Sequence, residues 1–163
     1  MKRKRSTKVE TQKLKQSQFI LIYTDGAGAR PHGKGSAIAW VRTDISENHV
    51  EMVDGLTNNQ AEYRSILSAL QSIPEQSAVE IRSDSQVAVY QLSGVYRTSN
   101  PDLGDLQALI NTLIARRKLI AKFTWIPRAQ NHADKLLQRQ KAKPLTSTGT
   151  AEPSVEQRKK IRK

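Results

Sequence analysis

The spacing of the apolar residues changes once along this chain, near residue 57, and this change limits the folds that the chain can adopt. Before it, apolar runs at 19–23, 37–41 and 49–53 are joined by short links, which predicts three strands in an antiparallel meander. After it, apolar residues recur at the spacing of one helix face: Tyr63, Ile66, Leu67, Leu70 and Ile73. A chain that changes from strand to helix periodicity in this way is expected to fold as a sheet covered by helices.

The first helix is predicted to begin after Thr57, which forms a capping box with Gln60, and to end before Pro74. The remaining predicted elements are, in order, a strand at 79–82, a helix at 84–92, a longer helix from Asn100, a strand at 122–126 and a helix at 131–139. The longer helix has a stripe of six apolar residues: Leu103, Leu106, Leu109, Ile110, Leu113 and Ile114. The order βββαβααβα predicts an α/β fold in which a mixed five-stranded sheet is flanked by helices.

The net charge of +12 is concentrated at the two ends of the 163-residue chain. Residues 1–17 contain seven basic residues and one acidic residue, and residues 135–163 contain nine basic and two acidic residues, whereas 18–134 contain eleven basic and twelve acidic residues. Because they have few apolar residues to bury, 1–17 and 141–163 are expected to be disordered basic arms around one domain at 18–140. Such arms either keep the protein dispersed in water or add salt-sensitive affinity for nucleic-acid phosphates.

The composition also restricts the compartment in which the chain is expected to work. No apolar run reaches 18 residues and the first 17 residues have no apolar signal-peptide core, so we expect neither a membrane span nor a secretory leader. The absence of cysteine excludes disulfides and zinc–thiolate sites. We therefore expect an intracellular protein, cytoplasmic in a prokaryote, with the basic runs at 2–5 and 158–163 pointing to a nuclear location as the alternative. A monomer is the default expectation.

Four acidic residues lie where predicted strands end or predicted helices begin: Asp25, Glu62, Asp84 and Asp134. The carboxyl ends of parallel strands form one crevice of an α/β sheet, so these side chains are expected to converge there. Converging carboxylates repel one another unless cations neutralise them, and ligands that are all oxygen favour Mg²⁺ or Mn²⁺ over zinc. Two such ions make a site that cleaves phosphodiesters. Each acid alone also has a structural interpretation. Asp25 would be a simple turn residue, Glu62 a charge that complements a helix N-terminus, Asp84 a helix cap, and Asp134 a member of a capping pair with Asn131.

The segments that contain these acids are YTDGAG at 23–28, TNNQAEY at 57–63, SDSQ at 83–86 and NHAD at 131–134. In this order they resemble the type 1 ribonuclease H family, over about residues 19–140. The resemblance implies an RNase H-like fold and an endonuclease that hydrolyses the RNA strand of RNA–DNA hybrids, leaving 5′-phosphate and 3′-hydroxyl ends. It implies two metal ions, Mg²⁺ or alternatively Mn²⁺, when the substrate is bound. It also implies catalytic and metal-binding roles for all four acids: Asp25 on both ions, Glu62 and Asp84 on one of them, and Asp134 on the other.

The same resemblance implies residues that contact the hybrid substrate. They are Gly26, Asn58, Asn59, Gln60, Ser85, Gln86 and Asn100. The segment 94–103 takes the place of the basic handle of some bacterial members, so the chain is similar to the shorter archaeal and bacterial forms. In this segment Tyr96, Arg97 and Asn100 approach the DNA strand in one interpretation, whereas in the other Asn100 caps a helix and Tyr96 packs down.

One spacing differs from the family pattern, because Asn131 precedes Asp134 by three residues where many members have four. This difference bears on the orientation of Asp134. His132, between them, either assists product release or is an exposed residue at the start of a helix. The alternative function is therefore a non-catalytic module that binds RNA or hybrids on the same fold. A third hypothesis, another nuclease of the same superfold, fits the TNNQAEY and TDG segments less well.

Overall fold

β1 (Phe19–Ala27) is the central strand of a five-stranded sheet in the computed structural model, which describes residues 19–29 and 35–142. The other strands are β2 (Ser36–Arg42), β3 (Glu47–Val53), β4 (Ala78–Ser83) and β5 (Ile120–Trp125), and the order across the sheet is β3-β2-β1-β4-β5. The pairs β1/β2 and β2/β3 are antiparallel, whereas β1/β4 and β4/β5 are parallel. The predicted meander and the mixed sheet are therefore confirmed.

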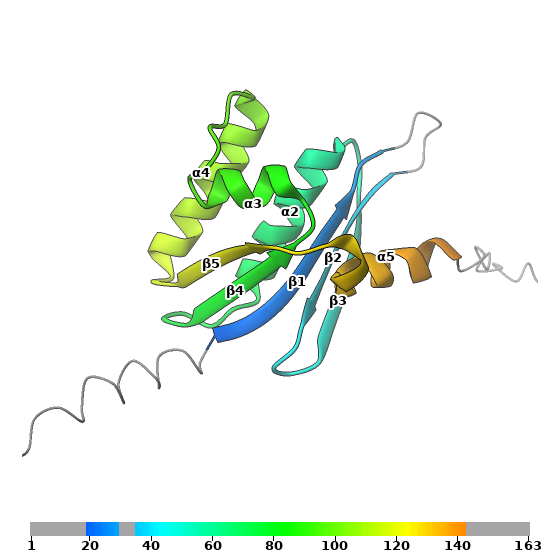
Figure 1. Cartoon of the computed structure of the whole chain (residues 1–163), viewed down its shortest axis with the longest axis horizontal. Coiled ribbons are helices and arrows are strands. Elements are labelled where there is room, and N and C mark those ends of the chain that lie inside the picture. Colours follow the sequence, from blue (N-terminus) through cyan, green and yellow to red (C-terminus); the bar gives the residue numbers. More distant parts are fainter. Residues whose placement is uncertain (1–18, 30–34, 143–163) are drawn as a thin grey trace, which may run out of the picture.

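The helices cover both faces of this sheet, as Figure 1 shows. They are α2 (Asn58–Gln71), α3 (Gln86–Leu92), α4 (Pro101–Arg116) and α5 (His132–Ala142), with a short 3₁₀ turn, η1 (Arg128–Gln130), before α5. The first three lie on one face, and α5 lies on the other, against β1 and β2. No helix in the ranges 19–29 and 35–142 is long and apolar enough to cross a membrane.

Local sequence signals account for where the helices begin. The hydroxyl of Thr57 accepts a hydrogen bond from the Gln60 amide and the Gln60 side chain accepts one from the Thr57 amide, so the predicted capping box is present. Ser85 caps α3, and Asn100 caps α4 directly before Pro101. α5 continues to Ala142, two residues past the predicted domain end, and the rest of the two predicted basic arms lies outside the described residues.

A larger apolar core fills the space between the sheet and α2, α3 and α4, and a smaller one lies under α5. Most of the predicted α4 stripe packs against the larger core, but the expectation for Leu109 is wrong, because its side chain is 53% exposed. Leu109 lies about 100° around the helix from the buried Ile110, so it points away from α2.

Three of the predicted acids lie at slightly different places in their elements. β1 does not end before Asp25 but continues to Ala27, because its pairing with β2 extends through Asp25 opposite Ala39. Glu62 lies in the second turn of α2 rather than the first, and Asp84 lies in the link between β4 and the Ser85 cap. Asp25 is therefore not a simple turn residue, Glu62 is not in the first turn of α2, and Ser85 rather than Asp84 caps α3.

Candidate active site

The N-terminal part of α2 lies directly against β1, and two glycines make this approach possible. A Cβ atom at Gly26 would lie 2.2 Å from the backbone carbon of Ala61, and one at Gly28 would lie 2.4 Å from the amide nitrogen of Asn58. No side chain fits in either space. The Gly28 amide also donates a hydrogen bond of 2.8 Å to Asn58 Oδ1. This contact places Glu62 of α2 opposite Asp25 of β1.

Asp25, Glu62 and Asp84 come together at this end of the sheet. Each offers one carboxylate oxygen, and the three oxygens lie within 4.8 Å of one another. Asp25 comes from β1 and Asp84 follows β4. These two strands are parallel, so both residues lie at the same end of the sheet. The predicted convergence of acids at the carboxyl ends of parallel strands is therefore seen for these three residues, which we call the acidic triad.

Burial and mutual repulsion make two members of this triad, Asp25 and Glu62, hard to ionise. Burial, followed by the charges of Asp84 and Asp134, raises the pKa of Asp25 from 3.8 to about 7. Burial, with the neighbouring Asp25 and Asp84, raises the pKa of Glu62 well above its ordinary value. Within the part of the chain that the structure describes, Glu62 Oε2 is buried and has no hydrogen-bond partner. A buried oxygen in this state fits a cation ligand, and a donor set made only of carboxylates fits a hard divalent cation.

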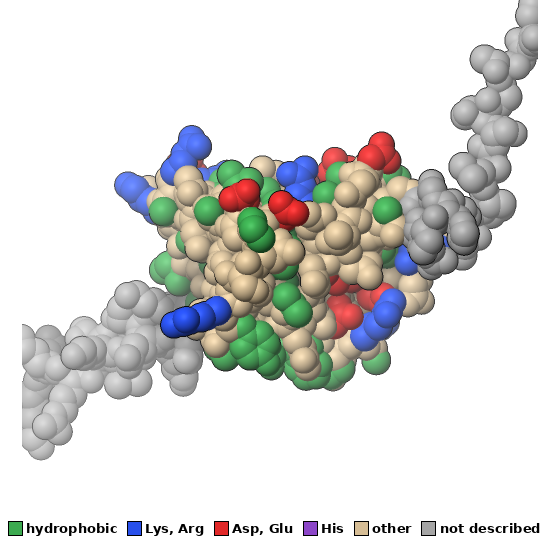
Figure 2. All heavy atoms as spheres, turned by 90° about the horizontal axis from the view of Figure 1, so that it is seen from above, with side chains coloured by type: hydrophobic (Ala, Val, Ile, Leu, Met, Phe, Trp, Pro, Cys, Tyr) green, Lys and Arg blue, Asp and Glu red, His purple; other side chains and the backbone are tan. Residues whose placement is uncertain are grey.

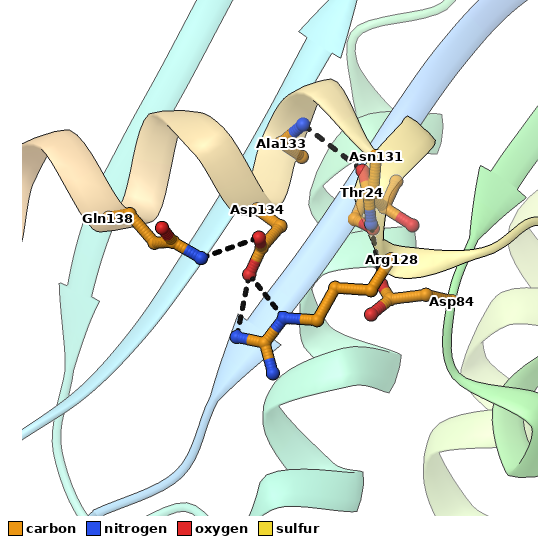
Figure 3. A network of polar contacts seen from close by, with 7 residues as sticks. All are labelled: Thr24, Asp84, Arg128, Asn131, Ala133, Asp134 and Gln138. Carbon is orange, nitrogen blue, oxygen red and sulfur yellow. Dashed lines mark hydrogen bonds and ion pairs between the residues drawn. The ribbon is translucent and has the colours of Figure 1, made fainter.

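Asp84 is held by two residues from other elements. The fully buried Asn131 donates from Nδ2 to Asp84 Oδ1 at 2.6 Å and to the Thr24 carbonyl at 3.0 Å, and its Oδ1 accepts from the Ala133 amide. Trp125 Nε1 donates to the Asp84 carbonyl at 3.2 Å. Asn131 thus ties the start of α5 to β1 and to the triad (Figure 3). Asp134 does not share this capping role among the described residues, because its carboxylate accepts hydrogen bonds from the side chains of Arg128 and Gln138.

Asp134, the fourth predicted acid, lies near the triad but outside the group of converging oxygens. Its Oδ1 accepts hydrogen bonds from Arg128 Nε at 3.0 Å and from Arg128 Nη2 at 2.8 Å, and its Oδ2 accepts one from Gln138 Nε2 at 2.7 Å. Figure 3 shows Asp134 between these two side chains. The structure therefore brings three of the four acids together and pairs the fourth with an arginine.

Most of the residues expected to contact substrate already serve the fold. Asn58 bonds to Gly28, Gln60 and Thr57 form the capping box, Ser85 caps α3, and Asn100 caps α4 by accepting from the amides of Asp102 and Leu103. Asn59 and Gln86 are exposed. In the segment that takes the place of the handle, Arg97 is exposed, and Tyr96 is half exposed, with its ring edge-on to that of Tyr90. Substrate contact stays a prediction for all of these residues.

Two residues that contact the fourth acid were missed by sequence reasoning. Gln138 lies four residues after Asp134 on a helix, so its contact follows from helix geometry and could have been expected. Arg128 lies in η1, and no periodic signal marks it. His132 is exposed at the start of α5, as one interpretation predicted, but its ring also stacks on Tyr23 with 4.3 Å between centroids.

Comparisons with known proteins agree with this geometry. The model of the RNase H family matches residues 17–141. Ribonuclease HI of Halobacterium salinarum is 32% identical over 123 residues, which are 69% of this chain and 58% of that protein. A bifunctional protein of Mycobacterium tuberculosis is 32% identical over 72% of this chain, but the match covers only about a third (34%) of that protein's length.

Two solved structures are also similar over most of the described residues. The N-terminal RNase H domain of the mycobacterial protein has a TM-score of 0.62 at 25% identity, covering 77% of this chain and 99% of that one. LC11-RNase H1, in a crystal structure with an RNA/DNA hybrid, has a TM-score of 0.63 at 32% identity, covering 72% of this chain and 92% of that one.

Proposed function

Because this chain belongs to the RNase H family, we propose that it is an endonuclease that hydrolyses the RNA strand of RNA–DNA hybrids, using two divalent metal ions. The observation that carries the proposal is the acidic triad, Asp25, Glu62 and Asp84, with a buried Glu62 oxygen that lacks a hydrogen-bond partner among the described residues. The similarity to LC11-RNase H1, whose structure contains an RNA/DNA hybrid, supports the choice of substrate.

In this proposal the triad holds one Mg²⁺ or Mn²⁺ ion and Asp134 contributes to holding a second. Bound there, such ions would supply an activated water and would stabilise the charge on the leaving oxygen, so that the products would carry 5′-phosphate and 3′-hydroxyl ends. The chain itself keeps the ligands in place. Asn131 and Trp125 hold Asp84, and the contact at Gly26 sets the distance between α2 and β1.

Contacts with the hybrid would come from the rim of the triad. Asn59 lies three residues before Glu62 and Gln86 lies two residues after Asp84, and both side chains are exposed. Asn58 and Gln60 would have to exchange hydrogen bonds within the protein for bonds to the minor groove, so we propose smaller roles for them. Gly26 would contact substrate through its main chain, because it has no side chain.

The test is cleavage of a labelled RNA–DNA hybrid in the presence of Mg²⁺, Mn²⁺ or EDTA, beside RNA–RNA, DNA–DNA and single-stranded controls. Asp84→Asn keeps an oxygen for the Asn131 hydrogen bond but removes a negative ligand, so we expect normal folding and a loss of cleavage of at least about a hundredfold. Asp105→Asn, at an exposed position on α4, is the matched control.

Cleavage by purified Asp84→Asn at the wild-type rate would contradict the assigned site. Binding of the hybrid without cleavage under every metal condition would instead favour the alternative, a non-catalytic hybrid-binding module. The engagement of Asp134 by Arg128 is the observation that favours that alternative.

A further inference from the structure

We propose that Arg128 is a positioning residue that competes with the second metal ion for Asp134, so that Arg128 must release this carboxylate before the second ion can bind. This inference rests on the proposed function, because it concerns the ions of the same site. It assigns a role to a residue that none of the sequence motifs contains. The contacts of Asp134, the unequal exposure of the two partners and the charges around them carry the inference.

Both oxygens of Asp134 are engaged in the structure. Two N–H groups of one guanidinium point at Oδ1, and the side-chain amide of Gln138 points at Oδ2. Arg128 makes two hydrogen bonds from a charged guanidinium, whereas Gln138 makes one from a neutral amide, so Arg128 holds Asp134 more strongly than Gln138 does. A cation that binds Oδ1 of Asp134 therefore has to displace the Arg128 guanidinium from this oxygen (Figure 3).

The exposure of the two partners decides which of them moves. The Asp134 side chain is 8% exposed, whereas the Arg128 side chain is 68% exposed. The backbone around Arg128 is fixed, because the Asn131 amide donates to the Arg128 carbonyl at 3.0 Å. The guanidinium can therefore turn out into water by side-chain rotation alone, while Asp134 stays at the start of α5.

The surrounding charges explain why a cation belongs beside Asp134. The charge of Asp134 contributes to the raised pKa of Asp25, so its negative charge reaches the triad. Asp134, and to a smaller extent Asp25 and Asp84, raise the pKa of Arg128 above its ordinary value. Arg128 therefore supplies one positive charge to a group of four acids, and a second divalent ion would replace it with two.

The test measures Mn²⁺ binding to the full chain, without nucleic acid, by isothermal titration calorimetry. In the wild type we expect one tighter ion at the triad and a second, weaker ion that Asp134→Asn removes. Arg128→Gln is expected to tighten the second site about tenfold, because the fork on Oδ1 is gone. The matched control, Lys135→Gln, removes the same charge from an exposed neighbour of Asp134 and is expected to change both sites only slightly.

Two further variants separate geometry from charge. Arg128→Lys keeps the charge without the planar pair of donors and is expected to lie between wild type and Arg128→Gln. Gln138→Ala removes the neutral partner and is expected to tighten the second site less than Arg128→Gln. Equal second-site affinities in Arg128→Gln and Lys135→Gln would overturn the inference, and so would a second site that survives Asp134→Asn.

The hybrid cleavage assay distinguishes this inference from the proposed function. If the protein never cuts the hybrid but Arg128→Gln still tightens the second Mn²⁺ site, the proposed activity fails and the competition stands. If the protein cuts the hybrid but Arg128→Gln and Lys135→Gln bind Mn²⁺ alike, the activity stands and the competition fails.

Discussion

At the scale of single residues, the site depends on where charges and missing side chains are placed. Asp25 and Glu62 are buried beside other acids, so their ionised forms are unfavourable until a cation arrives. Gly26 and Gly28 contribute by lacking a side chain, because a Cβ atom at either position would collide with the backbone of residues 57–62. Ligand affinity and stability therefore oppose each other at Asp25 and Glu62, whereas both depend on the glycines.

The raised pKa of Asp25 gives the metal-free protein a specific pH dependence. Between about pH 4 and pH 7 the folded state keeps a proton on Asp25 that the unfolded state has lost, so this group makes the free energy of unfolding fall as the pH rises through that window. Asp25→Asn removes the effect. We expect the variant to gain about 2–4 kcal/mol over wild type between pH 4 and 7, measured by urea unfolding in EDTA.

The control for this pH effect is Asp105→Asn, whose difference from wild type is expected to stay constant with pH. Saturating Mn²⁺ should stabilise the wild type and reverse the order of Asp25→Asn and wild type. A difference between Asp25→Asn and wild type that does not change between pH 4 and 7 would show that Asp25 ionises normally in the folded protein.

The close approach at Gly26 leads to a second expectation. In Gly26→Ala the new methyl group meets the backbone of Ala61, which cannot move aside without shifting α2, so Glu62 should move away from Asp25. We expect a loss of at least about 2 kcal/mol in unfolding free energy and weaker Mn²⁺ binding. Gly104→Ala, in α4 with no atom within 4 Å of the new Cβ, should instead stabilise by up to about 1 kcal/mol. Equal stability of the two variants would contradict the packing explanation.

At the scale of elements, the site is the meeting point of β1, α2, the β4–α3 link and α5. The parallel pairing of β1 and β4 brings Asp25 and Asp84 to the same end of the sheet, and α2 packs against β1. Asn131 connects α5 to both strands through Thr24 and Asp84, which are 107 and 47 residues away in the sequence. The buried side-chain amide of Asn131 therefore holds β1, the β4–α3 link and α5 together.

Replacing this amide with a carboxylate tests that connection. Asn131→Asp keeps an oxygen to cap the Ala133 amide but removes both donated hydrogen bonds and places a charge beside Asp84. We expect a loss of about 3–5 kcal/mol in the unfolding free energy in EDTA, partly recovered by Mn²⁺. Gln130→Glu adds the same charge at the preceding, exposed position and should cost less than about 0.5 kcal/mol. Similar losses in the two variants would mean that added charge alone, rather than the buried bridge, is responsible.

At the scale of the whole molecule, the described residues and the rest of the chain differ in charge. The ranges 19–29 and 35–142 contain twelve basic and twelve acidic residues, so the net charge of +12 belongs to the residues outside them. On the face of the molecule in Figure 2, acidic and basic side chains are scattered among uncharged groups. Nonspecific attraction to a polyanion is therefore expected to come mainly from the two ends of the sequence.

Neutralising these ends should change the salt dependence of hybrid binding. In the full-length chain, glutamine in place of the basic residues at 2–5 and at 158–160 and 162–163 removes nine positive charges. We expect weaker binding at 50 mM salt and a smaller slope of log affinity against log salt, measured by fluorescence anisotropy with catalysis blocked by EDTA. A chain with the same number of serine or threonine residues changed at these ends is the control. An unchanged slope would mean that the ends only keep the protein dispersed.

Sequence patterns alone were sufficient to predict the elements, their order and the mixed sheet, because apolar periodicity and capping residues act over a few neighbours. They also marked Asp25, Glu62, Asp84 and Asp134, since all four lie near the ends of elements. Only the tertiary structure decided which oxygens meet. The triad, the bridge through Asn131 and the pairing of Asp134 with Arg128 depend on distances between segments that packing brings together. Such distances leave no periodic trace in the chain, so no local pattern could have separated Asp134 from the other three acids.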